Sequence, residues 1–107
     1  MRAMEKRKPH YNLREIQSIV MRDGMNAFTA TAVRNGLEMG LNDIAMLSAI
    51  AGMHTTMLFK SMTTVRDNSL WQDVYHVPLS DGRVAYIKLT KQDGAVVIQF
   101  KDREGER

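Results

Sequence analysis

The stretch RVAYIKLTKQDGAVVIQFK, residues 83–101, decides the fold, because polar and apolar residues alternate on both sides of an Asp-Gly pair. Alternation of this kind is typical of strands with one buried and one solvated face, and Asp-Gly is a strong signal for a tight hairpin turn. A two-residue turn at Asp93-Gly94 sets the register so that Tyr86 lies opposite Lys101. The hairpin therefore has one apolar face and one polar face.

A third strand is predicted in LWQDVYHVPL, residues 70–79, which precedes this hairpin. The turn at 81–82 leaves two registers open. A two-residue loop would turn Gln72 toward the apolar side, whereas a three-residue loop with a bulge would not. The longer loop is favoured because it keeps Gln72 and His76 out of the core, although it turns Asp73 toward the helices.

The polar face of this predicted sheet has two interpretations. An open antiparallel sheet has a solvated face in any case, and Lys, Gln and Tyr are ordinary residues there. The same residues also suit a surface for phosphate or nucleic acid, where lysines meet backbone charge and aromatic rings stack on bases. The polar face gathers Tyr86, Lys88, Gln99 and Lys101 and, in the favoured register, Gln72, Val74 and His76.

The first half of the chain has helical periodicity instead. Asn12 caps a helix that ends before Gly24, a second helix is predicted over 29–39, and Asn42 caps a third over 43–51. Helices followed by antiparallel strands predict an α+β fold with the N-terminal helices on one face of the sheet. The apolar side chains that this periodicity assigns to the core are Leu13, Ile16, Ile19, Val20, Ala32, Val33, Leu37, Met39, Ile44, Leu47 and Ile50.

The composition is that of one small globular domain, with 107 residues, 44% of them hydrophobic and 25% charged. We expect a globular core over about 10–101 and flexible tails at 1–9 and 102–107. A short helical turn from Thr55 is expected to carry Phe59 inward and to leave Lys60 near its end. The longest apolar run is too short to cross a bilayer, so no membrane association is expected.

The charged and metal-binding residue types narrow the function further. Fifteen Lys and Arg against twelve Asp and Glu give a net charge of +3, which favours a nucleic-acid or acidic partner. The chain has no cysteine, which excludes disulfides and cysteine zinc sites. His10, His54 and His76 lack metal-ligand spacing, so we expect no metal and no cofactor.

Five segments occur together in an order that carries a resemblance. They are MEKRKPHYNL (4–13), LFKSMTT (58–64), LWQDVYHV (70–77), YIKLT (86–90) and VVIQFK (96–101). The series resembles the MqsR (motility quorum-sensing regulator) family of bacterial toxins over nearly the whole chain.

The resemblance implies a RelE-like fold and a cytoplasmic bacterial mRNA interferase, an endoribonuclease that cuts mRNA near GCU without a ribosome. It also implies a type II toxin-antitoxin system, in which an MqsA-like antitoxin with a zinc-binding N-terminal domain and a helix-turn-helix C-terminal domain holds the toxin inactive. The catalytic roles that it carries over fall on Lys60, Gln72, Tyr86 and Lys101.

RNA supplies its own nucleophile, the 2′-hydroxyl beside the scissile phosphate, so such an enzyme needs alignment, charge neutralisation and proton transfer rather than a metal. Lys60 and Lys101 would flank the phosphate, and Tyr86 would serve in proton transfer. Lys88, Gln99 and His76 are expected to bind RNA. The alternatives are a non-catalytic RelE/ParE-like toxin that blocks a protein target, and a plain RNA-binding module.

Overall fold

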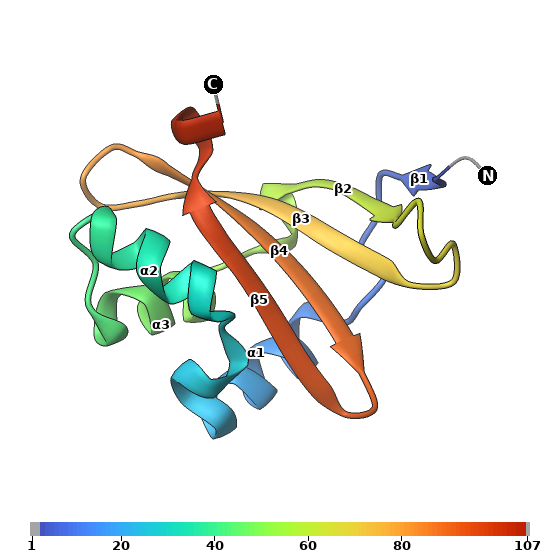
Figure 1. Ribbon diagram of the computed structural model, residues 1–107, viewed down its shortest axis with the longest axis horizontal. Helices are drawn as coiled ribbons and strands as arrows, with labels where there is room; N and C mark the ends of the chain where they lie inside the picture. The colour runs from blue at the N-terminus through green and yellow to red at the C-terminus, as the bar shows by residue number, and fades with distance from the viewer. Residues whose placement is uncertain (1–2, 107) are drawn as a thin grey trace.

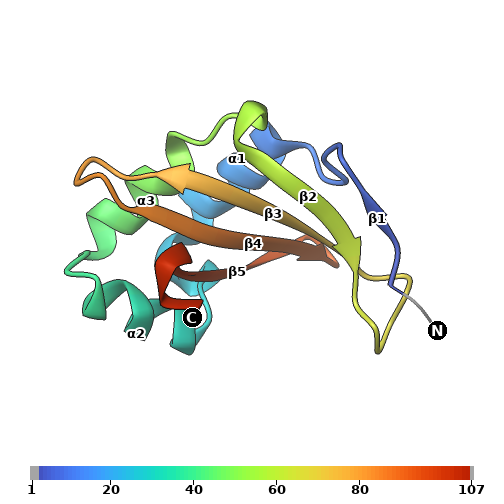
Figure 2. The same cartoon turned by 90° about the horizontal axis from the view of Figure 1, so that it is seen from above.

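In the computed structural model, which describes residues 3–106, the chain forms an antiparallel sheet with helices packed on one face (Figures 1 and 2). The strands lie side by side in chain order, from β1 at one edge to β5 at the other. This arrangement confirms the predicted α+β class and is consistent with a RelE-like fold. The strands within residues 3–106 are β1 (Glu5–Lys6), β2 (Leu58–Thr63), β3 (Trp71–Pro78), β4 (Val84–Gln92) and β5 (Ala95–Asp102).

Each helix begins at an N-cap residue, and two of these caps, Asn12 and Asn42, were predicted. The side-chain oxygens of Asn12, Thr29 and Asn42 accept hydrogen bonds, at 3.0, 3.0 and 2.8 Å, from backbone N–H groups three residues later. A cap of this kind stabilises a helix by about 1 kcal/mol. No helix within residues 3–106 has the length and hydrophobicity that a membrane crossing requires. The α-helices in this range are α1 (Leu13–Asp23), α2 (Ala30–Glu38) and α3 (Asp43–Ala51).

The core lies between the helices and the apolar face of the sheet. Ile87 and Ile98 are completely buried there, which confirms the alternation predicted for the hairpin. The prediction was wrong for Leu37 and Ile44, which are 63% and 74% exposed. Ile44 lies roughly 200° around α3 from the buried Met46, at about 100° per residue. Because this helix is apolar on nearly all sides, its periodicity identified the buried Ile50 but also assigned the exposed Ile44 to the core.

Both predicted hairpin registers are confirmed. Gln92 pairs with Ala95 across a turn in which Asp93 and Gly94 both have positive φ, 55° and 78°. In the first hairpin the Leu79 N–H donates to the Arg83 carbonyl at 2.8 Å, which is the register of the longer loop.

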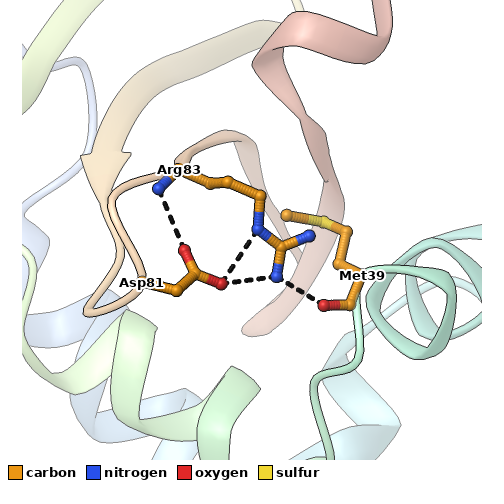
Figure 3. Close-up of polar contacts among 3 residues, drawn as sticks. All are labelled: Met39, Asp81 and Arg83. Carbon is orange, nitrogen blue, oxygen red and sulfur yellow. Dashed lines mark hydrogen bonds and ion pairs between the residues drawn. The ribbon is translucent and has the colours of Figure 1, made fainter.

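The tip of that first hairpin is tied to the end of α2 (Figure 3). The Arg83 guanidinium donates to the Asp81 carboxylate and to the Met39 carbonyl, both at 2.5 Å. This contact fixes the start of β4, the strand that carries Tyr86, relative to the helical layer.

Two strands, β1 and β2, were not predicted. The helical turn expected from Thr55 is limited to a 3-10 turn, η2 (Thr55–Met57), after which β2 begins. Phe59, expected to point inward, is 43% exposed. The sequence of β2 lacks the alternation of polar and apolar residues that is typical of a strand, because this strand buries hydroxyl side chains. Ser61 is fully buried, and its single hydroxyl proton is shared between the Lys8 carbonyl oxygen at 2.8 Å and the Asp73 carboxylate at 2.6 Å.

The chain ends are also more structured than expected. β1 pairs with β2, and the Met4 N–H donates to the Thr63 hydroxyl at 2.8 Å, so the described part of the 1–9 segment is held against the sheet edge. Asp102 belongs to β5, and a 3-10 turn, η3 (Arg103–Glu106), follows it. Residues 1, 2 and 107 of the expected tails lie outside the described residues.

Asp73 and Trp71 attach the N-terminal segment to β3. The Asp73 carboxylate, 1% exposed, accepts hydrogen bonds from the His10 N–H at 3.0 Å and the Tyr11 N–H at 2.9 Å. The Trp71 ring stacks on His10, with centroids 5.0 Å apart, and the Lys6 ammonium lies 4.3 Å from its centroid. Trp71 therefore anchors the N-terminal segment to the sheet.

Candidate active site

The face of the sheet opposite the helices, here called the open face, carries the predicted site residues on adjacent strands. Tyr86 pairs with His76 on one side and with Lys101 on the other, as the sequence predicted. The Lys101 ammonium lies 4.8 Å from the centroid of the Tyr86 ring. A tyrosine ring and an ammonium group thus lie next to each other on a partly exposed surface.

A second row of residues runs beside the first. Lys60 pairs with Val74, Val74 with Lys88, and Lys88 with Gln99. Val74 is fully buried although it points to the open face, and the long aliphatic stems of the two flanking lysines can cover it. The Lys88 ammonium lies 6.0 Å from the Tyr86 ring centroid. The structure therefore places Lys60 on the same face as Tyr86, a position that strand alternation alone had not given.

Gln72 is a candidate that the structure does not bring next to Tyr86. It pairs with Met62, and its side-chain amide lies 3.4 Å from the Thr90 hydroxyl. It precedes His76, the cross-strand partner of Tyr86, by four residues, which is roughly 13 Å along a strand. Gln72 therefore lies on the open face beyond the lysine row.

The N-terminal segment contributes two charged residues that the sequence did not indicate. The Glu5 carboxylate accepts a hydrogen bond from the Lys60 ammonium at 2.8 Å. This hydrogen bond and the charge of Lys60 hold the pKa of Glu5 below its ordinary value. The Arg7 guanidinium donates to the Phe59 carbonyl at 3.0 Å.

Phe59 is a further open-face residue that the sequence did not predict there. The register of β2 against β3 shifts between Leu58 and Lys60, which leaves Phe59 as an extra, unpaired residue. Its ring stacks on His76 with centroids 4.4 Å apart and planes 15° apart, and His76 lies 5.8 Å from Tyr86. Burial, and secondarily the charge of Arg103, lowers the pKa of His76, so its ring is uncharged at neutral pH.

Of two hollows of the surface that could hold a ligand, only the smaller one is lined by predicted site residues. A hollow of about 360 Å³ opens beside Tyr86, Gln99 and Lys101 and is bounded by the start of α2. A larger one, of about 730 Å³, lies between the N-terminal segment and α1 and contains none of the predicted site residues. We place the site at the smaller hollow, because cationic and proton-transferring side chains converge there.

The residue types gathered here suit a phosphodiester ligand and proton transfer. Lys88 and Lys101 supply positive charge near the Tyr86 ring, and Lys60 supplies a further ammonium group on the same face. The neighbouring rings supply surfaces on which bases can stack. Within residues 3–106, no three His, Asp or Glu side chains lie close enough together to hold a metal ion.

Comparisons with known proteins identify the family. Residues 8–102 match the family described as "Motility quorum-sensing regulator, toxin of MqsA". The chain is also 37% identical, over 100 residues, to the mRNA interferase toxin MqsR of Escherichia coli (strain K12), an alignment that covers 94% of this chain and 100% of that protein. Both findings confirm the resemblance carried by the five sequence segments. The chain belongs to the MqsR family of toxins.

Proposed function

We propose that this chain is an mRNA interferase that cuts mRNA near GCU without a ribosome and without a bound metal. The class of activity, endoribonuclease, follows from the family, whose Escherichia coli member is an mRNA interferase toxin. The observation that carries the chemistry is the pairing of Tyr86 with Lys101 on the open face, with the Lys101 ammonium 4.8 Å from the tyrosine ring.

The proposed reaction is in-line attack by the 2′-hydroxyl of the RNA. The 2′-oxygen bonds to phosphorus while the bond from phosphorus to the 5′-oxygen breaks. The 2′-hydroxyl loses a proton and the departing 5′-oxygen gains one, which leaves a 2′,3′-cyclic phosphate and a 5′-hydroxyl. No cofactor takes part, since the nucleophile belongs to the substrate.

The protein contributes charge neutralisation and proton transfer to this reaction. Lys101 and Lys60 offset the negative charge that develops on the phosphate, and the Tyr86 hydroxyl exchanges a proton with the reacting oxygens. Gln72, about 13 Å from the Tyr86 row along β3, binds a neighbouring nucleotide rather than the reacting phosphate. Lys88, Gln99 and His76 hold the adjoining RNA.

The family description, toxin of MqsA, makes an antitoxin the partner of this chain. We propose that the antitoxin is MqsA-like, with a zinc-binding N-terminal domain and a helix-turn-helix C-terminal domain, and that both proteins act in the bacterial cytoplasm.

The test is incubation of the purified toxin, freed from antitoxin, with a long RNA in excess EDTA. The proposal predicts cleavage that EDTA does not affect, with fragments ending in 2′,3′-cyclic phosphates near GCU. Cleavage that stops in EDTA and returns with added metal would overturn the proposed chemistry. Binding without cleavage would favour an RNA-binding module, and neither binding nor cleavage would favour a toxin with a protein target.

A further inference from the structure

The β-bulge in β2 places two residues on the open face side by side. Leu58 pairs with Tyr75 and Lys60 pairs with the next residue, Val74, so two steps along β2 correspond to one step along β3. An extra residue of this kind re-aims its side chain, and bulges are common beside active sites. The bulge therefore brings the Phe59 ring to the surface next to Lys60.

The Phe59 ring is supported on one side and surrounded by positive charge. His76 lies nearly parallel beneath it, with centroids 4.4 Å apart. The Lys60 ammonium and the Arg7 guanidinium lie 5.5 and 5.7 Å from its centroid. Phe59 is 43% exposed, so a ligand can reach it from solvent. A partly exposed ring with two cations within about 6 Å of its centroid suits a nucleobase attached to a phosphate backbone.

The ring also lies in line with the proposed reaction site. His76, which supports Phe59, is 5.8 Å from Tyr86, and Tyr86 is paired with Lys101. Phe59, His76, Tyr86 and Lys101 thus form one row across β2, β3, β4 and β5. RNA with its reacting phosphate between Tyr86 and Lys101 would carry a neighbouring base toward Phe59.

We propose that Phe59, supported by His76, is a stacking site for an unpaired nucleobase of the RNA next to the cleaved phosphate. This inference rests on the proposed nuclease function and adds a specificity determinant to it. A base can stack on Phe59 only when it is not paired inside a duplex, so the site selects single-stranded RNA. Any base has a face that can stack, so Phe59 selects strandedness rather than sequence.

The test measures binding to a short RNA whose 2′-hydroxyl at the cleaved position is replaced by hydrogen, so that the RNA cannot be cut. Phe59→Ala should weaken binding roughly 5- to 150-fold, the range for loss of one base–aromatic stack. Phe59→Trp should restore binding, since tryptophan also stacks, and Phe59→Leu should not, since leucine is apolar but not aromatic.

Val97→Ala is the matched control. Val97 is also apolar, lies on the open face at 43% exposure, and pairs with Thr90 away from the Tyr86 row. This variant should bind RNA as the unchanged protein does. Equal losses for Phe59→Ala and Val97→Ala would show a general effect of exposed apolar surface and would overturn the inference.

An RNA that lacks one base identifies the stacking partner directly. An abasic sugar is placed in turn at each nucleotide flanking the uncut bond. At one of these positions, loss of the base should weaken binding to the unchanged protein as much as Phe59→Ala weakens binding to the intact RNA. The Phe59→Ala variant should bind that abasic RNA almost as well as it binds the intact RNA. The two changes would then remove the same contact. Additive losses at every position would contradict the proposal, as would a Phe59→Ala protein that binds RNA normally and fails only to bind antitoxin.

Because the substrate cannot be cleaved, these measurements separate the two proposals. If the unchanged protein stacks a base but does not cut ordinary RNA, the stacking site stands and the nuclease chemistry fails. If it cuts ordinary RNA and Phe59→Ala binds and cuts equally well, the chemistry stands and the stacking site fails.

Discussion

Two tyrosines show how strand alternation assigns different roles to the same side chain. Tyr75 faces the helices, is fully buried, and has its pKa raised to about 12, mainly by burial. Tyr86 is on the neighbouring strand but points to the open face beside Lys101. Only Tyr86 can reach a substrate.

Replacing each tyrosine by phenylalanine should therefore separate these roles. Tyr86→Phe removes a hydroxyl that we place in proton transfer, and the cleavage rate at saturating RNA should fall about 10²- to 10⁴-fold. Tyr75→Phe should leave that rate within a few-fold of the original. Single-turnover cleavage measures both rates. A Tyr86→Phe protein with the original rate would remove this residue from the mechanism.

The N-terminal segment is the structural element that depends most on one side chain. Asp73 accepts hydrogen bonds from the backbone of His10 and Tyr11 and from the Ser61 hydroxyl. These bonds connect the segment, β2 and β3 at a buried carboxylate. Glu5 belongs to this segment and contacts Lys60. By holding the segment in place, the Asp73 carboxylate therefore also stabilises the edge of the site.

Asp73→Asn should destabilise the protein, because one carboxylate oxygen becomes an NH₂ group facing backbone donors. Leaving a buried donor unsatisfied typically costs about 1–3 kcal/mol of the free energy of unfolding. The control is Asp93→Asn, at an exposed turn where φ is 55° and asparagine is well tolerated. Urea denaturation compares the two variants. Equal stabilities would contradict the importance of the Asp73 network.

The molecule as a whole should lose stability in mild acid because two histidines are held uncharged. Burial lowers the pKa of both His10 and His76, and nearby positive charges, from Lys6 and Arg103 respectively, lower it further. An unfolded histidine, with an ordinary pKa of about 6.5, therefore binds protons at a pH where the folded one does not. The free energy of unfolding is then largest above the unfolded pKa of about 6.5. It decreases as the pH falls through the lower pKa of the folded histidines.

Urea denaturation at pH 7 and at pH 5 should accordingly give a lower free energy of unfolding at pH 5. The double variant His10→Gln/His76→Gln should show a much smaller difference between the two pH values. If the double variant loses as much stability as the unchanged protein, other groups cause the acid sensitivity.

The features that the sequence predicted correctly have local signals. The N-caps Asn12 and Asn42 and the Asp93-Gly94 turn determine their own geometry, and this turn sets the pairing of Tyr86 with Lys101. The buried face of α3 was predicted only in part, since Ile50 is buried but Ile44 is exposed, because its apolar residues surround the helix.

The edge of the sheet depends on contacts that are distant in sequence. β2 was missed because its buried Ser61 binds Asp73 and the N-terminal segment, so its sequence looks polar. Phe59 was placed inward because no local pattern marks the bulge. Its position beside Lys60 in the sequence was the only indication of a role. The separation of Gln72 from Tyr86 likewise follows from the strand register, whereas the family resemblance grouped them by role alone.

The most direct test of the proposed active site compares Lys101→Ala with Lys91→Ala in single-turnover cleavage at saturating protein and in EDTA. Both variants lose one positive charge, but Lys91 points to the helical face, where it forms an ion pair with Glu15. Lys101 lies beside Tyr86, and removing one preorganised donor from such a site typically costs about 10²–10³ in rate. We predict that loss for Lys101→Ala and at most a few-fold loss for Lys91→Ala. Equal losses in both variants would mean that general positive charge drives cleavage, and the site described here would be wrong.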